Sequence, residues 1–169
     1  MRNDTVSYKE QARSFLESAT EARLEAGRRK ARVAELSLRC NRLVAAAGGA
    51  PGRGGGDMEL LWAALVDERD REQQAQLREL EQYRRVEEFI QRLPEPSHRL
   101  ILRRRYLAGQ TNWVQVRQRL DRDGLYYSES HLKRLHGQAL SSAGELLRRE
   151  LEASEGEKID KEVREDGTL

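Results

Sequence analysis

The feature that most constrains the fold of this chain is a regular alternation of three- and four-residue spacings between apolar residues near its N-terminus. The row runs over about five heptads with one charged interruption, at Arg29. Its positions are Ala12, Phe15, Ala19, Ala22, Ala26, Arg29, Val33, Leu36, Cys40, Leu43 and Ala47. This spacing is typical of the a and d positions of a coiled coil. It predicts one long helix, from about Thr5 to Ala47, that packs against another helix and buries Cys40 as a small apolar residue.

A second long helix is expected after a glycine-rich break at 48–56, because glycine and proline disfavour helical backbone. The break lacks the Gly-Lys-Ser/Thr ending of a phosphate-binding loop, so it predicts a hinge, with Asp57 capping the next helix. That helix should run from Met58 to about Leu93. Its apolar positions are Leu61, Trp62, Leu65, Val66, Leu77, Leu80, Tyr83, Val86, Ile90 and Leu93. The two helices fit either an antiparallel hairpin within one chain or pairing with copies in another subunit.

Composition excludes several classes of protein. Charged residues make up 36% of the chain and hydrophobic residues 37%, which is too polar for one large compact core. No stretch approaches the roughly 18 apolar residues of a membrane span, and no apolar signal-peptide core is present. We therefore expect a cytoplasmic protein with no membrane partner. The single cysteine excludes an internal disulfide and a cysteine-based zinc site. We expect no metal, no cofactor and no enzymatic activity, since no catalytic set lies in a segment able to form a buried pocket.

A smaller domain of three capped helices is predicted over 94–151. Pro94 and Pro96 end the preceding helix. The expected helices span 97–109, 112–120 and 129–149, with Ser97, Thr111 and Ser128 as their N-caps and a turn at Asp123-Gly124. Three short helices with a tight turn between the last two predict a helix-turn-helix unit. The expected fold is therefore all-α: a helical hairpin or coiled-coil arm over 1–93, the helix-turn-helix domain, and a disordered acidic tail over 152–169.

The side chains of this domain favour an anionic partner. Residues 94–140 hold nine Lys/Arg and four Asp/Glu, whereas residues 150–169 hold three basic and eight acidic residues. A solvated helical surface is the alternative interpretation. The outward face at the start of the third helix presents Glu129, Ser130, Lys133, Arg134 and Gln138. Such a face can reach base edges in the major groove while the apolar opposite face fixes the helix to its support. Glu129 can accept from cytosine, and Lys133 or Arg134 can donate to guanine.

Three stretches of the domain, 101–109, 112–116 and 127–140, carry a family resemblance. The third is the most specific, with a Tyr-Ser start at 127–128 followed by Arg-Leu-His-Gly-x-Ala-Leu. With these stretches, Leu93–Leu140 looks like region 4 of sigma-70-type transcription factors. It is more similar to the small phage and prophage transcriptional regulators of the ArpU/RinA type, which also have a helical N-terminal arm. The linker from Leu120 to Tyr127 is longer than is usual in the family.

The resemblance implies a sequence-specific regulator of phage or prophage late genes that binds double-stranded DNA in the bacterial host cell. It places Glu129, Ser130, Lys133 and Arg134 at the bases, and we expect Gln138 of the same outward face to join them. It places Arg103, Arg104 and Arg105 near phosphates or RNA polymerase, and we expect the same contacts for Thr111, Asn112, Ser128 and His131. The arm would form a homodimer or contact a partner. Two alternatives stay open: a DNA-packaging protein similar to terminase small subunits, and a coiled-coil adaptor or assembly protein that binds no DNA.

Overall fold

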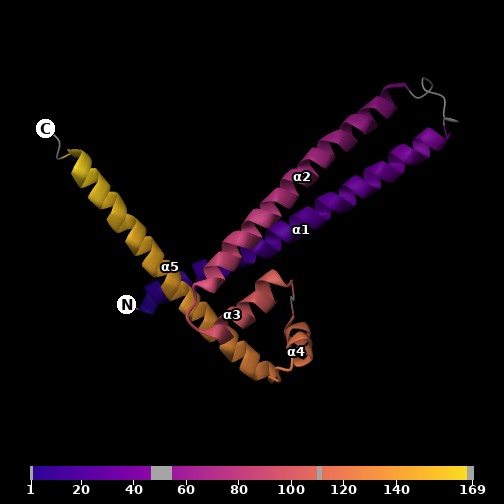
Figure 1. Cartoon of the computed structure of the whole chain (residues 1–169). Coiled ribbons are helices and arrows are strands. Elements are labelled where there is room, and N and C mark those ends of the chain that lie inside the picture. Colours follow the sequence, from indigo (N-terminus) through magenta and orange to yellow (C-terminus); the bar gives the residue numbers. More distant parts are fainter. Residues whose placement is uncertain (1, 47–54, 110–111, 167–169) are drawn as a thin grey trace. The chain divides into compact units, whose positions relative to one another are not determined.

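The computed structural model describes residues 2–46, 55–109 and 112–166, which form helices and no strand (Figure 1). The helices are α1 (Arg2–Ala46), α2 (Gly55–Gln91), α3 (Pro96–Leu102), η1 (Arg103–Leu107, a π-helix), α4 (Trp113–Arg122) and α5 (Glu129–Asp166). The prediction of an all-α chain is confirmed.

The chain divides into two compact units. Residues 19–84 form one unit, here called the arm, and residues 1–18 together with 85–169 form the other, here called the head. The sequence places the boundary at Leu93, whereas in the structure the start of α1 and the end of α2 belong to the head. The reason is apolar packing within the head: the rings of Phe15 on α1 and Phe89 on α2 meet edge to face, with centroids 5.1 Å apart.

In the arm, α1 and α2 of the same chain pack against each other, so the structure shows the intrachain hairpin. The predicted seam of α1 is largely right, since Ala19, Ala26, Leu36 and Cys40 are buried. Leu36 and Cys40 form a core cluster with Leu65 of α2. Leu43 is exposed, contrary to the prediction, because it lies in the last turn of α1. Ala47 lies outside the described residues.

The predicted seam of α2 is wrong over much of its length. The prediction buries five apolar residues that the structure exposes: Trp62, Val66, Leu77, Leu80 and Tyr83. The buried or half-buried row, spaced alternately by three and four residues, is instead Leu61, Leu65, Glu68, Glu72, Ala75, Glu79, Gln82, Val86 and Phe89. Four of its nine positions are polar. Counting apolar residues therefore selects the wrong face of this helix.

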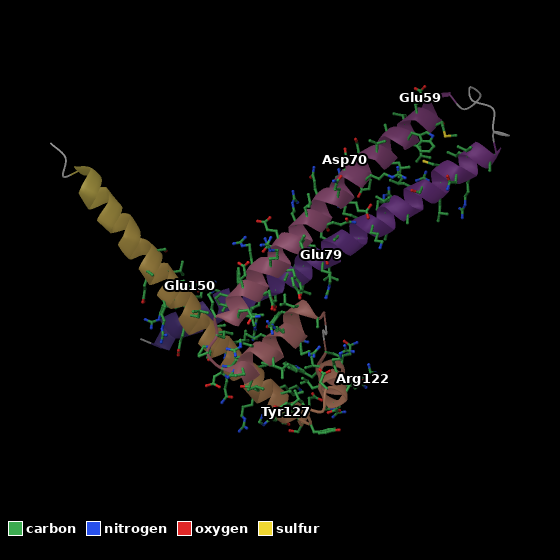
Figure 2. The ribbon with its side chains drawn as sticks, in the orientation of Figure 1. Glu59, Asp70, Glu79, Arg122, Tyr127 and Glu150 are labelled. Atoms are coloured by element: carbon green, nitrogen blue, oxygen red, sulfur yellow. The ribbon has the colours of Figure 1, made fainter. Side chains whose placement is uncertain are left out.

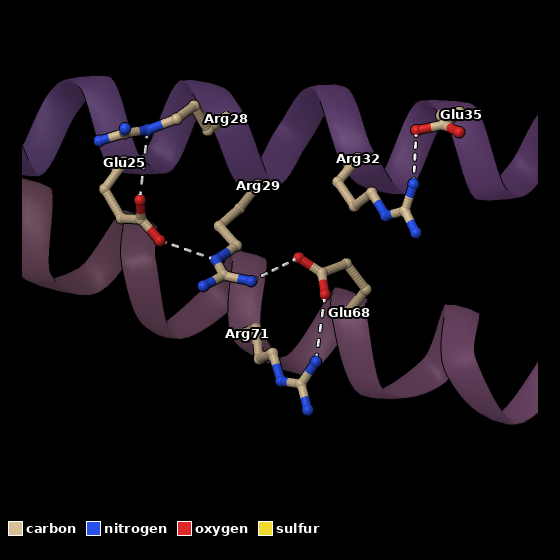
Figure 3. A network of polar contacts seen from close by, with 7 residues as sticks. All are labelled: Glu25, Arg28, Arg29, Arg32, Glu35, Glu68 and Arg71. Atoms are coloured by element: carbon tan, nitrogen blue, oxygen red, sulfur yellow. Dashed lines mark hydrogen bonds and ion pairs between the residues drawn. The ribbon is translucent and has the colours of Figure 1, made fainter.

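The one buried charged residue of this row, Glu68, is paired across the arm (Figure 3). Arg29 of α1 donates a hydrogen bond from Nη1 to Oε1 of Glu68 at 3.0 Å, and Arg71 donates to Oε2 at 3.3 Å. Arg29 also donates from Nε to Glu25 at 2.8 Å. The hydrogen bond from Arg29 holds the pKa of Glu68 below its usual value, although burial acts in the opposite direction. The charged interruption in the seam of α1 is therefore matched by a charged position in the seam of α2.

This pairing predicts the outcome of a double-mutant cycle on the full chain. Glu68→Leu should lower the melting temperature, because it leaves the guanidinium of Arg29 in the seam without its main partner. Arg29→Leu should also lower the melting temperature, because it removes the main partner of the buried Glu68 carboxylate. The double substitution R29L/E68L should recover most of the loss, because two packed leucines need no counter-charge. Additive losses in the double variant, measured by thermal denaturation at neutral pH, would contradict the pairing.

The ends of the arm helices differ from the sequence prediction. Residues 48–54 of the predicted hinge at 48–56 lie outside the described residues, but Gly55 and Gly56 are helical. Asp57 is consequently not an N-cap; it lies in the first turn of α2, where a carboxylate favours the helix dipole. At the other end, α2 stops at Gln91 rather than Leu93.

The helix that follows the arm starts and ends differently from the prediction. Its N-cap is Glu95, without a side-chain hydrogen bond, and Pro96 opens the helix, so Ser97 is not the cap. Proline fits here because the first helical position needs no N–H donor. The α-helix passes into η1, whose closing bond runs from the Ala108 N–H to the Arg103 carbonyl at 2.9 Å. The predicted stop at Gly109 is confirmed by its φ of 73°.

The last two helices meet at a turn that the sequence largely predicts. Thr111 lies outside the described residues, and the cap of α4 is Asn112, whose side chain accepts from the Gln115 N–H at 2.8 Å. The turn at Gly124 is confirmed, with a φ of 79°. Ser128 caps α5 as predicted, because its hydroxyl accepts from the His131 N–H at 3.2 Å.

Helix α5 is much longer than expected. The sequence predicts an end near Arg149 and a disordered tail over 152–169, whereas the helix continues to Asp166. Glu, Lys and Ala fill just over half of this segment and are good helix formers, while Gly156 is its poorest helix former. Residues 167–169 lie outside the described part of the chain.

The core of the head is formed by apolar residues of α3, η1, α4 and α5. The buried residues of α3 to α5 include Ile101, Leu102, Tyr106, Val116, Leu120, Leu132, Ala139, Leu140 and Ala143. On α5, Gly144 lies against the backbone of α1: a Cβ added to it would stand 3.0 Å from the nitrogen of Lys9. The backbone of α1 around Tyr8 and Lys9 thus packs directly on α5 at Gly144.

Candidate nucleic-acid interface

The first turns of α5 have two chemically distinct faces, as the sequence predicts. Leu132, Ala139 and Leu140 are buried. The predicted base-reading residues lie on the outward face: Ser130, Lys133, Arg134 and Gln138 are exposed, and Glu129 is half-buried. The helix is thus fixed by its apolar side and presents a polar side that a groove could receive.

The charges in this first turn are only loosely held. Lys133 Nζ lies 2.6 Å from Glu129 Oε1 in an i,i+4 pair, in which the side chain of Lys133 is 55% exposed and that of Glu129 is 41% exposed. The hydrogen bond from Lys133 is the largest cause that lowers the pKa of Glu129, and the charge of Arg117 on α4 contributes further. Exposed pairs of this kind contribute little to stability. Lys133 can therefore leave Glu129 for a stronger anion, and Arg117 lies near enough to act on the same surface.

Helix α4 contributes three cations that the sequence analysis did not assign. Arg117, Arg119 and Arg122 are exposed, and no acidic side chain in the described parts of the chain pairs with them. Figure 2 shows Arg122 on α4 and Tyr127 just ahead of α5. The signal was available in the sequence, because these arginines alternate with the apolar positions Val116 and Leu120 of one helix.

The three consecutive arginines expected at phosphates or polymerase are instead engaged within the head. Arg103 forms a two-point ion pair with Glu87 of α2. Arg104 pairs with Asp123 at 2.5 Å, at the end of α4. Arg105 lies over the ring of Trp113, 4.9 Å from its centroid. Each arginine joins two segments of the head, so their charges take part in internal packing, and their contacts with phosphates or polymerase stay a prediction.

The other predicted phosphate contacts lie at the two caps. The side-chain oxygens of Asn112 and Ser128 accept backbone hydrogen bonds of α4 and α5, although both residues remain exposed. His131 stacks on Tyr127 with ring planes 10° apart, and its Nδ1 lies 3.2 Å from Arg134. Beside this stack, Tyr126 is 81% exposed. The start of α5 therefore carries exposed aromatic, polar and cationic groups together.

His136 lies beneath this surface as a packed, hydrogen-bonded residue. Its Nε2 lies 3.0 Å from the hydroxyl of Tyr106, and its ring meets Trp113 edge-on with centroids 5.1 Å apart. Burial is the main cause that lowers the pKa of His136 to about 4, and the nearby positive charges of Arg105, Arg13 and Lys9 add to it. The neutral ring thus links η1, α4 and α5.

The lowered pKa of His136 predicts a specific pH dependence of stability. An unfolded histidine binds a proton near pH 6.5, whereas in the folded head His136 does so near pH 4. Between these values the unfolded state holds the extra proton, so stability should fall as the pH falls, by at most ~1.4 kcal/mol per pH unit. Urea denaturation from pH 7 to 4 should show a shallower fall in H136Q than in the unsubstituted chain. An unchanged slope in H136Q would refute the assignment.

No protein-family model, curated protein or solved structure matches this chain. Within the described ranges, every helix falls short of the length or the apolar character that crossing a membrane requires. The same residues contain no group of three or more His, Cys, Asp and Glu side chains placed to hold a metal ion. The function proposed below therefore rests on the geometry of the head.

Proposed function

We propose that this chain binds double-stranded DNA through α4 and the start of α5, with α5 in the major groove. The observation that carries the proposal is the exposed surface where the two helices meet. It combines the polar face of α5 with the three exposed arginines of α4 that have no acidic partner in the described structure. Cations on the flanking helix suit phosphates, and short polar and basic side chains on α5 suit base edges.

The proposed division of roles follows from which side chains are available. Base contacts are assigned to Glu129, Ser130, Lys133, Arg134 and Gln138. Phosphate contacts are assigned to Arg117, Arg119 and Arg122, together with the amino end of α5 that Ser128 caps, where backbone N–H groups and the helix dipole favour an anion. Arg103, Arg104 and Arg105 are left to hold the head together.

The salt dependence of binding tests this proposal. For three phosphate contacts, the logarithm of the association constant should fall with the logarithm of salt concentration at a slope of about −3, since each contact contributes about −0.9. Arg119→Ala should reduce this slope by about one. The matched variant R149A removes one positive charge from an exposed site in the second half of α5, and it should leave the slope unchanged. An affinity for duplex DNA that does not respond to salt would overturn the proposal.

The resemblance to ArpU/RinA-type regulators extends the proposal to a biological role. We infer a regulator of phage or prophage late genes that acts in the bacterial cytoplasm, contacts RNA polymerase, forms a homodimer through its arm and has no enzymatic activity. Selection of bound duplexes from a random pool should return one preferred site. If no preferred site is recovered and the chain forms a ring of many subunits in solution, a DNA-packaging role is supported instead.

A further inference from the structure

A second row of mainly small or apolar residues runs along α1, on the side that α2 does not cover. Its positions, spaced alternately by four and three residues, are Thr20, Leu24, Gly27, Ala31, Ala34, Leu38, Asn41 and Ala45, here called the outer row. Leu24 and Leu38 are 55% and 57% exposed. A Cβ added to Gly27 would meet nothing within 4 Å. Because the outer row and the buried seam lie about 140° apart on the helix, α1 has two coiled-coil faces, and α2 covers only one of them.

We propose that the outer row is a dimerisation surface and that its occupant is the outer row of a second copy of this chain, running antiparallel. The proposal specifies the homodimer named above and does not depend on DNA binding. Two properties of the outer row support this dimer: the sizes of its side chains and the charges along its edges.

The side-chain sizes are complementary in one antiparallel register, in which Ala31 lies opposite Ala34 of the second copy. Leu38 then lies opposite Gly27, and Leu24 lies opposite Asn41. Small residues at the centre allow the two helices to approach closely, and Gly27 leaves room for the leucine that faces it. Asn41 is also short, and it lies near the end of the paired region, where its amide group can turn to water instead of being buried without a partner.

The charges along one edge select the same register. This edge alternates in sign every seven residues, through Glu21, Arg28, Glu35 and Arg42. In the register described, Glu21 faces Arg42 of the second copy and Arg28 faces Glu35, which two-fold symmetry doubles to four favourable pairs. If one copy is shifted along the other by one heptad, Arg28 faces Arg28 of the second copy. A one-heptad shift in the opposite direction makes Glu35 face Glu35 of the second copy. Both shifts set like charges together.

A parallel pair of outer rows fits less well. It would set Asn41 opposite Asn41, which coiled coils accept, but it would also set Gly27 opposite Gly27, with no side chain to fill the space between the helices. Along the edges it would place Arg23 beside Arg28, an unfavourable pair, and Lys30 beside Glu35, a favourable one. These charges cancel in a parallel pair, whereas in the antiparallel pair Arg23 and Lys30 face uncharged residues, Val44 and Ser37.

The charges of the favourable edge are only weakly engaged within the chain. Arg28 pairs with Glu25 at 3.4 Å, and Glu35 pairs with Arg32 at 2.7 Å, each less than one turn away on α1. Both pairs are exposed, and exposed pairs of this kind contribute little to stability. Arg28 and Glu35 are therefore available to a second copy.

The mass of the full chain in solution tests the proposal. Sedimentation equilibrium over a concentration series should give twice the chain mass of 19.5 kDa. L24E/L38E should halve that mass with helicity unchanged, because the substituted positions are already exposed. The control L77E/L80E, on α2 at positions 61% and 59% exposed, should remain a dimer. A monomeric unsubstituted chain, or an unchanged mass in L24E/L38E, would overturn the proposal.

Exchange of charges tests the register. The chain R28E/R42E has a wholly acidic edge, and the chain E21R/E35R has a wholly basic one. Each alone should dimerise at least tenfold more weakly than the unsubstituted chain, and a mixture should form the heterodimer. A tighter dimer of R28E/R42E alone would indicate the parallel pair, and failure of the mixed chains to associate would likewise refute the antiparallel register. These outcomes are read from mass and not from DNA affinity, so they stand apart from the test of the proposed function.

Discussion

The double substitution K133A/R134A is expected to weaken binding to the preferred duplex by about 100-fold. Each lost base contact should cost ~1–3 kcal/mol, and a tenfold change in affinity corresponds to about 1.4 kcal/mol. Both side chains are exposed on the outward face of α5, so the fold of the head should not change. Titration of a labelled duplex, selected beforehand from a random pool, measures the loss at a single salt concentration.

A control on the same helix separates base contacts from net charge. R148A/R149A removes the same two charges from exposed positions about four turns further along α5. Its affinity for the same duplex should stay within a few-fold of the unsubstituted chain. Equal losses in the two double variants would mean that overall charge, rather than the face after Ser128, sets the affinity, and would contradict the assignment.

Gly144→Val is expected to destabilise the head by about 1–3 kcal/mol, which is the usual cost of forcing extra atoms into a packed site. Already the first added carbon would stand 3.0 Å from the backbone nitrogen of Lys9 and 3.1 Å from the carbonyl carbon of Tyr8. Backbone atoms of α1 cannot rotate away as a flexible side chain could. Urea denaturation at neutral pH measures the difference in the free energy of unfolding.

Gly137 provides the matched control for this helix. A Cβ added to Gly137 meets nothing within 4 Å, so Gly137→Ala should stabilise the chain by about 0.5–1 kcal/mol through helix propensity alone. Opposite signs for G144V and G137A are therefore expected on one helix. A valine at 144 that leaves stability unchanged would show that α1 does not rest on α5 at this point.

The parts of the fold that local chemistry decides are the parts that the sequence predicts well. Ser128 caps α5 because a hydroxyl there satisfies a free N–H, and Gly109 and Gly124 take the left-handed conformations that glycine adopts easily. The three- and four-residue spacing of α1 likewise predicts its buried seam. These signals lie within a few residues of the structure that they determine.

The seam of α2 could not be predicted in the same way, because its burial depends on a partner helix. Glu68 is buried only because Arg29, 39 residues earlier in the chain, supplies its counter-charge. On sequence alone, Leu77 and Leu80 are better candidates for burial than any glutamate. The structure shows the reverse, since tertiary pairing decides which row of α2 faces α1.

The candidate site shows the same limit. A count of basic residues reveals a cationic domain but not which cations are already paired. Arg103 and Arg104 are tied to Glu87 and Asp123, whereas Arg117 and Arg122, equally basic in the sequence, are exposed without an acidic partner in the described residues. The outward face of α5 was predictable because its apolar opposite face fixes its orientation. The contribution of α4 becomes clear only once the internal ion pairs are known.

The most direct test of the central proposal is a map of backbone amide NMR shifts on addition of duplex DNA to the full chain. We expect the largest shifts to cluster in α4 and in residues 128–138, and to disappear at high salt. Shifts confined to the arm, residues 19–84, or the absence of any shift at low salt, would contradict DNA binding through α4 and α5.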